Sequence, residues 1–321
     1  MTIFCCKQPP HERAEAIARR DPCNPFLTPA YQAAKGRLGI PSWLLQSVEQ
    51  NGDTTSAFAY VKQRYVYQSM AIESIPPLVP DSAFARELAM LCRRERVVAL
   101  SLGSFASRKS VPLPLFGQVM THQKRVEHII DLRSHHGLSA LSINLRRNIK
   151  KAEKSGVSFE RTNAVADCIN HVSLMDASIK RQRERGEAIP TYHALAWVNA
   201  LVEQGAADLF QVRQGNKVLS SLLILLSARG AYYQSAGTAP EGMACGASPF
   251  LVYRVIEFLR QQGFDEFNLG GATPSSSGLY RFKTAFGGYE RHVEAADVYV
   301  GTRWRQRVFN IARKSKAILS R

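Results

Sequence analysis

The order of helix and strand signals after residue 139 is the feature that most constrains how this chain can fold. Apolar periodicity, caps and stop signals predict helices at 139–155, 164–185, 191–204, 248–262 and 279–286. Alternating apolar residues between turn signals predict strands at 208–213, 218–226, 231–236, 264–269 and 289–300. The first three of these strands form a meander. The order predicts the α/β class with a mixed (α+β) sheet.

Helix and strand signals in the first half of the chain predict a smaller unit of the same class. After about forty residues without a clear period, the signals indicate a helix at 41–50, strands at 55–60 and 65–72, a helix at 81–94 and a strand at 97–102. A Pro-rich stretch at 111–116 ends this unit. The 321 residues exceed the roughly 250–300 at which a single hydrophobic core stops growing. We therefore expect domains at 1–138 and 139–300, followed by a tail at 301–321.

A short repeat links the two halves. Tyr67-Gln68-Ser69 and Tyr233-Gln234-Ser235 each end a predicted strand that follows another strand. The match is the trace of a duplicated unit or a coincidence of three residues, and the sequence leaves both explanations open.

The charge of the chain favours anionic partners. The chain has 42 Lys and Arg residues and 26 Asp and Glu residues, so its net charge is 42 − 26 = +16 and its pI is near 9.8. Nucleic acid, a phosphate-rich substrate and an acidic membrane surface all fit this excess. The tail at 301–321 has basic and apolar residues interleaved and no acid. It is expected to be a basic amphipathic helix on an anionic membrane or on tRNA, or a simple solvated helix.

Neither a metal site, a disulfide framework nor a membrane span is indicated. The six cysteines form no CxxC pair and have no histidine at metal-ligand spacing. The longest apolar stretch, 218–228, is interrupted by serines and reaches about half of the ~20 residues that a spanning helix needs. The chain is therefore expected to be cytoplasmic, with peripheral contact at the inner face of the membrane as an alternative.

Two stretches resemble a known family. They are the helix Leu145-Arg146-Arg147-Asn148-Ile149-Lys150-Lys151-Ala152-Glu153-Lys154-Ser155-Gly156-Val157 and the set Phe267-Asn268-Leu269-Gly270-Gly271, Gly278-Leu279-Tyr280-Arg281-Phe282-Lys283 and Phe286-Gly287-Gly288. They are similar to the second domain of Fem-like aminoacyltransferases and related acyltransferases. The resemblance implies the GNAT acyltransferase fold, here as two tandem GNAT-like domains, and transfer of an activated aminoacyl or acyl group to an amine.

The resemblance also bears on the donor. No bound cofactor is expected, and the co-substrate is aminoacyl-tRNA or acyl-CoA. The pyrophosphate turn of CoA-binding GNAT enzymes would fall at 243–248, where Gly246 and the predicted N-cap Ser248 are the phosphate-binding candidates. Because this turn lacks its usual first residue and keeps one glycine, we favour aminoacyl-tRNA, with acyl-CoA as the alternative. A non-catalytic basic protein that binds RNA or an anionic membrane is the alternative of another class.

Lys283 is the main catalytic candidate, carried over from the family's Phe-Lys pair. Between Phe282 and Phe286, its ammonium group would stabilise a developing oxyanion or bind a phosphate, with a solvated helix lysine as the structural alternative. The predicted loop with Gly270 and Gly271 is interpreted as an anion cradle or an acceptor gate. The remaining substrate-binding candidates of the signature are Tyr280, Arg281 and Phe282.

A basic ladder and several acids complete the candidates. On the helix at 139–155, the residues expected to contact phosphates of tRNA or of a nucleotide-linked precursor are Arg146, Arg147, Lys150 and Lys151. Glu241 is the candidate general base, because it follows the third strand of the meander. The alternatives for the base are Asp176, His193, Glu266 and a substrate that moves its own proton through water.

Overall fold

The computed structural model describes residues 3–48, 54–63, 67–76, 84–184, 195–272 and 277–302. The chain forms two compact units: unit 1 is Met1–Ile17, Lys35–Arg125 and His292–Arg321, and unit 2 is Ala18–Ala34 and Val126–Arg291. Both units are discontinuous in sequence, unlike the expected ranges 1–138 and 139–300. The difference arises because strands β6 (Gln118–Asp131) and β12 (Tyr289–Tyr299) each carry the chain from one unit into the other. Most of the predicted tail, from residue 303 on, lies outside the described residues.

Unit 1 is built on a mixed sheet. Its strands run in the order β1 (Phe4–Cys6), β2 (Ser42–Val48), β3 (Thr54–Gln63), β4 (Gln68–Ile72), β5 (Val97–Gly103) and β12. Only β4 and β5 pair in parallel. Helix α3 (Phe84–Arg94) packs its apolar stripe on this sheet, with Phe84, Leu88 and Leu91 in the core.

The expected helix at 41–50 is wrong. The segment forms β2, which pairs with β3 along its whole length from Ser42 to Val48 and with β1 on its other edge. Local helix signals are weak beside hydrogen bonds to two neighbouring strands and the burial of Leu44 and Leu45. The first forty residues, which show no period, contain the helices α1 (His11–Arg20) and α2 (Pro29–Arg37) and a 3-10 turn at Pro25–Leu27.

Unit 2 contains the predicted meander within a larger sheet. Residues 126–131 of β6 are followed across the sheet by β11 (Glu266–Ala272), β10 (Gly230–Thr238), β9 (Lys217–Leu226), β8 (Ala207–Gln214) and β7 (Ser158–Thr162). Only β10 and β11 pair in parallel. The strands at 208–213, 218–226 and 231–236 are thus confirmed.

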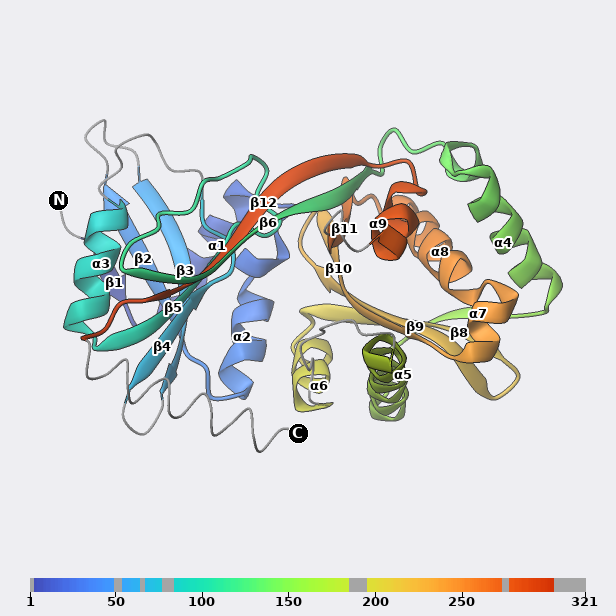
Figure 1. Ribbon diagram of the computed structural model, residues 1–321, viewed down its shortest axis with the longest axis horizontal. Helices are drawn as coiled ribbons and strands as arrows, with labels where there is room; N and C mark the ends of the chain where they lie inside the picture. The colour runs from blue at the N-terminus through green and yellow to red at the C-terminus, as the bar shows by residue number, and fades with distance from the viewer. Residues whose placement is uncertain are drawn as a thin grey trace. The chain divides into compact units, whose positions relative to one another are not determined.

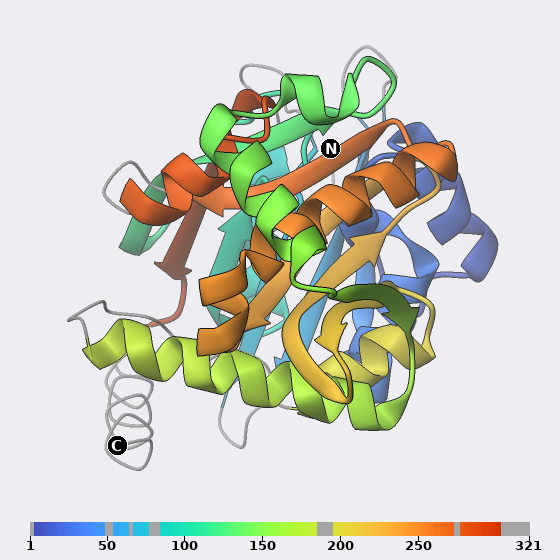
Figure 2. The ribbon, with the colours of Figure 1, turned by 90° about the vertical axis from the view of Figure 1, so that its right-hand side faces the viewer.

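Helices cover both faces of the sheet of unit 2. Helices α4 (Ile143–Lys154) and α8 (Ala247–Gln261) lie on one face, and α5 (Val165–Glu184) and α6 (Leu195–Glu203) on the other (Figure 1). Helix α4 crosses over α8 (Figure 2), so that Leu145 and Ile149 are buried against it. Two short helices, α7 (Pro240–Cys245) and α9 (Ser277–Thr284), precede α8 and β12. None of the described helices is long and apolar enough to span a membrane.

The two units repeat one plan. Three antiparallel strands, a helix and a parallel strand follow one another as β2-β3-β4-α3-β5 in unit 1 and as β8-β9-β10-α8-β11 in unit 2. The Tyr-Gln-Ser triplets fall in or beside the equivalent strands β4 and β10. This equivalence favours duplication over coincidence.

Helix α8 begins one residue earlier than predicted, and its N-cap is not Ser248. The N-cap is Gly246, with φ of +83°, and Ser248 lies inside the helix. A Cβ atom on Gly246 would stand 2.5 Å from the backbone oxygen of Asn148 in α4. Glycine is required there both for the left-handed backbone and for the contact between the two helices.

We expect Gly246→Ala to destabilise the protein more than Gly263→Ala. Both glycines are left-handed, with φ of +83° and +79°, but nothing lies within 4 Å of a Cβ atom on Gly263. Each variant loses about 1–2 kcal/mol from the backbone conformation, and Gly246→Ala adds about 1 kcal/mol or more from the clash. Denaturant unfolding measures both. Equal losses would show that the clash relaxes without cost.

Candidate active site

The two central strands of unit 2 separate. Strands β10 and β11 pair in parallel over a short stretch only, in which Gly230–Tyr232 of β10 lie beside Glu266–Asn268 of β11. Beyond these residues, β10 continues along β9 to Thr238, and β11 continues along β6 to Ala272. The sheet therefore opens between them, and both strands have a bulge near this point, between Tyr233 and Ser235 in β10 and between Asn268 and Gly271 in β11.

The equivalent strands of unit 1 stay together. The pairing of β4 with β5 begins with Gln68 beside Val97 and ends with Ile72 beside Leu102. Beyond their ends, a bridge joins Ser74 and Ser104. In the described residues of unit 1, the two parallel strands therefore do not separate as β10 and β11 do in unit 2.

The bulge of β11 is fixed by the side chain of Asn268. Its Oδ1 accepts a hydrogen bond from the Gly270 amide at 2.8 Å, and its Nδ2 donates to Oε2 of the buried Glu127 in β6 at 2.8 Å. Gly270 has φ of +74°. Gly270 and Gly271 thus lie inside a strand, which corrects their prediction as a loop. Gly270 suits this position because its backbone is left-handed and because a Cβ atom on it would stand 3.2 Å from the Tyr233 carbonyl oxygen.

Lys283 reaches from α9 into the opening. Its side chain is almost fully buried, at 4% exposed, and Nζ donates a hydrogen bond to the Gly271 carbonyl at 3.0 Å. Nζ also lies 5.6 Å from the centre of the Tyr233 ring and beside Gly270. The neighbouring rings of Phe282 and Phe286 contact each other, with Phe286 fully buried. A buried ammonium group between separated strands is not a solvated helix lysine, although its chemical role stays a prediction.

A histidine that the sequence does not reveal lies near Lys283. His128 is on β6, with its side chain 1% exposed, and its ring is 5.0 Å from that of Tyr280 in α9. Its Nδ1 is 3.9 Å from Oε1 of Glu290, which also accepts a hydrogen bond from the Tyr280 hydroxyl. Burial lowers the pKa of His128; the Glu290 carboxylate opposes this, and the Lys283 charge adds to it. The imidazole is therefore neutral at pH 7.

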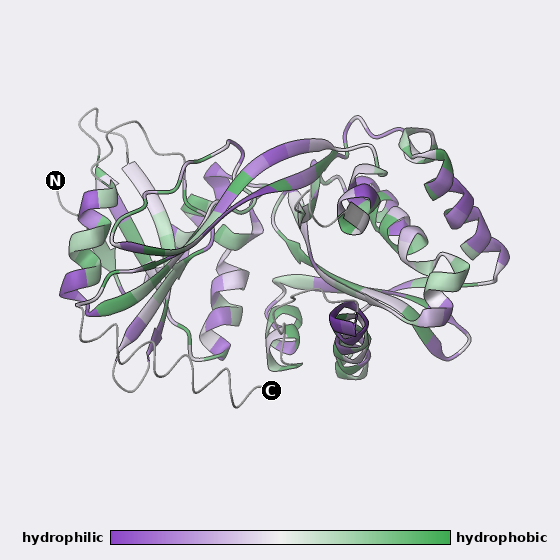
Figure 3. Ribbon diagram, in the orientation of Figure 1, coloured by the Kyte–Doolittle hydropathy of each residue, from purple (hydrophilic) through white to green (hydrophobic). Residues whose placement is uncertain are grey.

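The basic ladder lies on the outer face of α4. Arg147, Lys150 and Lys151 are exposed and Arg146 is half-buried, and this side of the helix is hydrophilic (Figure 3). In the part of the chain that the structure describes, none of the four forms an ion pair. They are free to meet an external anion.

The candidate bases that the structure describes lie on other elements than Lys283. Glu241 is on α7, past the end of β10, where its exposed carboxylate pairs with Lys217 at 2.6 Å and that hydrogen bond lowers its pKa. Asp176 is exposed on α5, and Glu266 begins β11 beside Arg291. His193 lies outside the described residues. A paired, exposed Glu241 is a weaker base than its position in the sequence suggests.

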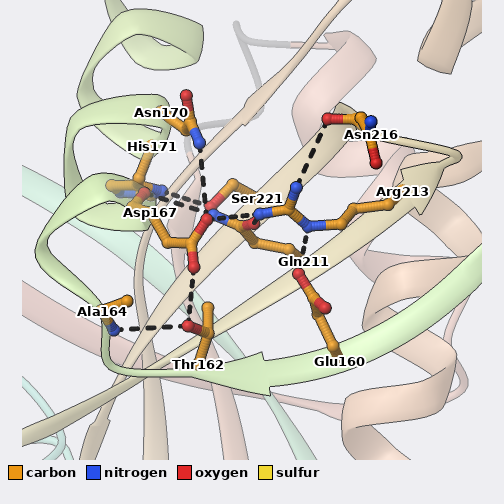
Figure 4. Close-up of polar contacts among 10 residues, drawn as sticks. All are labelled: Glu160, Thr162, Ala164, Asp167, Asn170, His171, Gln211, Arg213, Asn216 and Ser221. Atoms are coloured by element: carbon orange, nitrogen blue, oxygen red, sulfur yellow. Dashed lines mark hydrogen bonds and ion pairs between the residues drawn. The ribbon is translucent and has the colours of Figure 1, made fainter.

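A layer of polar side chains attaches α5 to the other face of the sheet (Figure 4). Arg213 of β8 points toward Asp167 in the first turn of α5 and also pairs with Glu160 of β7. Deeper in, the fully buried His171 has Nδ1 at 2.9 Å from Ser221 Oγ and Nε2 at 3.0 Å from Ser235 Oγ.

The same helix approaches the separated part of β10. A Cβ atom on Gly237 would clash with the backbone at Leu174, and Arg181 donates to the Thr238 carbonyl at 2.6 Å. The polar layer is thus satisfied and structural, and it supports one wall of the opening.

No three His, Cys, Asp or Glu side chains among the described residues are grouped as metal ligands. Arg281 is exposed on α9, Tyr280 and Phe282 are half-buried, and Gly246 lies buried between α4 and α8. The structure therefore brings together Lys283, Gly270, Gly271 and Tyr280, and leaves Glu241 and the ladder on other elements.

Comparison with known proteins bears on the fold and on the second half of the chain. Residues 141–284 match the family described as acetyltransferase (GNAT) domain. No curated protein matches the sequence. The fold is similar to a crystal structure of FemX, with 14% identity, 92% of this chain and 97% of that chain covered, and a TM-score of 0.63.

Two further structures share the fold. One is the C-terminal domain of a putative lysylphosphatidylglycerol synthetase from Agrobacterium fabrum, with 14% identity, 91% and 92% of the two chains covered and a TM-score of 0.54. The other is a tandem GNAT protein from the clavulanic acid biosynthesis pathway, with 9% identity, 94% and 99% covered and a TM-score of 0.56. The GNAT fold is confirmed, as is a GNAT-type acyltransferase domain in the second half of the chain.

We expect His171→Leu to destabilise the protein by about 1–3 kcal/mol, because it leaves the buried hydroxyls of Ser221 and Ser235 without the imidazole. Replacing both serines by alanine in the same chain should restore much of that loss. Denaturant unfolding of the single and triple variants tests this. A triple variant less stable than His171→Leu would contradict the assignment of His171 to a structural layer.

Proposed function

We propose that this protein transfers an activated acyl or aminoacyl group to an amine, at the opening between β10 and β11. The observation that carries the proposal is the buried ammonium group of Lys283 between two strands that separate in unit 2. Burying a charge is costly, so a folded protein keeps a buried ammonium group where its partners or its use offset that cost. A developing negative charge beside Nζ supplies that use.

The reaction suits this arrangement. An amine attacks the carbonyl carbon of an ester or thioester, and negative charge develops on the carbonyl oxygen. A positioned ammonium group in a water-poor site stabilises that charge in the transition state more than in the ground state. The Gly271 carbonyl and the Tyr233 ring fix the position of Nζ beforehand. No covalent intermediate with the protein is needed.

Two observations favour aminoacyl-tRNA as the donor. The residues before α8 form helix α7 rather than an open turn, and Gly246 and Ala247 are buried beside α4. The helix N-terminus that would bind the pyrophosphate of CoA is thus partly covered. The unpaired basic side chains of α4 fit a polyanion instead. Similarity in fold to FemX agrees with a Fem-like enzyme.

Acyl-CoA is the second candidate donor, because the structure of the similar tandem GNAT protein is described as a form without AcCoA. That description suggests AcCoA as a donor to test on this chain as well. A non-catalytic basic protein is less well supported. Binding through a basic surface explains the ladder on α4, but it gives no reason to bury Lys283.

We expect Lys283→Met to lower the rate of transfer by about 10²-fold or more, with a larger effect on kcat than on KM. Methionine keeps the aliphatic stem between Gly270 and Tyr233 and removes the charge, so the variant should melt near the wild-type temperature. Single-turnover assays with aminoacyl-tRNA and with acetyl-CoA, beside thermal melts, provide the measurement. Lys180→Met, on the exposed side of α5, is the control. A folded Lys283→Met variant within about threefold of wild type would remove this site from the proposal.

We also expect the double variant Arg147→Glu/Lys151→Glu to bind tRNA more weakly and with a shallower salt dependence, because each lost phosphate contact lowers the salt slope by about one. Affinity measured over a series of salt concentrations tests this. The variant Lys124→Glu/Lys180→Glu changes the net charge equally at exposed residues on other elements. The same loss in both variants would mean that only net charge matters and would exclude a specific role of α4.

A further inference from the structure

One buried atom near Lys283 has no partner. Nε2 of His128 is out of contact with solvent and makes no hydrogen bond. Buried polar atoms are normally satisfied, and each exception calls for an explanation. In the same unit, both ring nitrogens of His171 are bonded to serine hydroxyls. His128 is therefore missing a partner that the folded chain does not supply.

The bulge of β11 sets the position of His128. Ile129 is paired with Asn268 and Glu127 with Gly271, so His128 alone lies opposite Leu269 and Gly270. Gly270 is also the residue next to Lys283 Nζ. The histidine and the ammonium group thus flank the same glycine, from the neighbouring strand and from α9.

The other edge of the ring faces a carboxylate. Nδ1 is 3.9 Å from Glu290 Oε1, and the Tyr280 hydroxyl donates to the same oxygen. Three groups of other elements act on the imidazole: Lys283 and Tyr280 from α9, and Glu290 from β12. Glu290 favours the imidazolium, whereas Lys283 and burial favour the neutral ring. The histidine is neutral, its Nε2 makes no hydrogen bond, and the Glu290 carboxylate beside Nδ1 would stabilise the imidazolium. These are the features of a proton acceptor.

We infer that His128 is the general base of the transfer, and that its Nε2 takes the proton of the acceptor amine through one water molecule. Glu290 is a positioning residue that stabilises the imidazolium, and Tyr280 holds Glu290 in place. This inference rests on the proposed function and replaces Glu241 as the base.

The proton and the bonds balance within one turnover. The amine nitrogen forms a bond to the carbonyl carbon, and the π electrons of the carbonyl move to its oxygen beside Lys283. The nitrogen gives a proton to the water molecule, which passes one of its own to Nε2. When the intermediate collapses, the bond from carbon to the leaving oxygen or sulfur breaks, and the imidazolium returns the proton to that atom through water. His128 ends neutral, and no further reactant is consumed.

The test compares His128→Gln with His135→Gln in single-turnover transfer. His135 is also buried in unit 2, has an unpartnered Nε2 and a pKa lowered mainly by burial, but it lies beside Glu257. Glutamine can form a hydrogen bond at the position of Nε2 but cannot take up a proton. We expect His128→Gln to lose about 10²–10⁴-fold in rate and His135→Gln to stay within about threefold of wild type.

The dependence of rate on pH separates a chemical from a structural role. In the wild type, activity should fall with acid on two limbs, one from the acceptor amine and one at lower pH from His128. In His128→Gln the lower limb should be absent. In Glu290→Gln it should move to lower pH, because the loss of the carboxylate lowers the pKa of His128 further. NMR titration of the histidine should show the same direction in Glu290→Gln, with or without turnover.

The outcomes are distinct. If wild type is active and His128→Gln keeps both its rate and the lower limb, the general-base role is overturned while the proposed function stands. If His128→Gln and His135→Gln lose rate equally with melting temperatures lowered alike, the effect is structural and the role is also overturned. If wild type transfers from neither donor, the proposed function is overturned, and the general-base role of His128 is overturned with it.

Discussion

The two hydrogen bonds of the Asn268 side chain hold the structure of this site together. They tie the Gly270 amide and the Glu127 carboxylate to one residue, and so keep the bulge in β11 while the strand turns away from β10. Three features depend on that bulge: the opening in the sheet, the Gly271 carbonyl that receives Lys283, and the place of His128 opposite two residues. An amide can make both bonds at once because it is donor and acceptor together.

Much of unit 2 follows from sequence. The meander, the long helices and the strand before the signature obey simple periods, because each buries one regular face. Lys283 is predicted as a functional residue from its neighbouring phenylalanines and from the resemblance to Fem-like enzymes. Its burial is not predictable, since it results from the bulge in a neighbouring strand. Gly270 and Gly271 are predicted as a loop because glycine usually breaks strands, whereas here it permits a bulge within one.

The elements that the sequence patterns mispredict or miss in the rest of the chain have a common cause. The segment at 42–48 becomes a strand because β1 and β3 pair with it, and neither partner is visible in its local pattern. Strand β6, which carries His128, has no clear signal in the sequence, and no motif links it to Glu290 or Tyr280 more than a hundred residues later. Long-range pairing decides such elements, and periodicity within a short window does not report it.

The passage of β12 into unit 1 has a consequence for how the chain is made. Unit 1 needs residues 292–299 to cover the edge of β5, yet these residues leave the ribosome after the whole of unit 2. At roughly 5–20 residues per second, synthesis of the intervening part takes on the order of 10–40 s. During that time β5 presents an unpaired edge to other chains. The N-terminal unit of this protein is thus the last to be finished, and a nascent chain stalled before β12 carries an incomplete sheet.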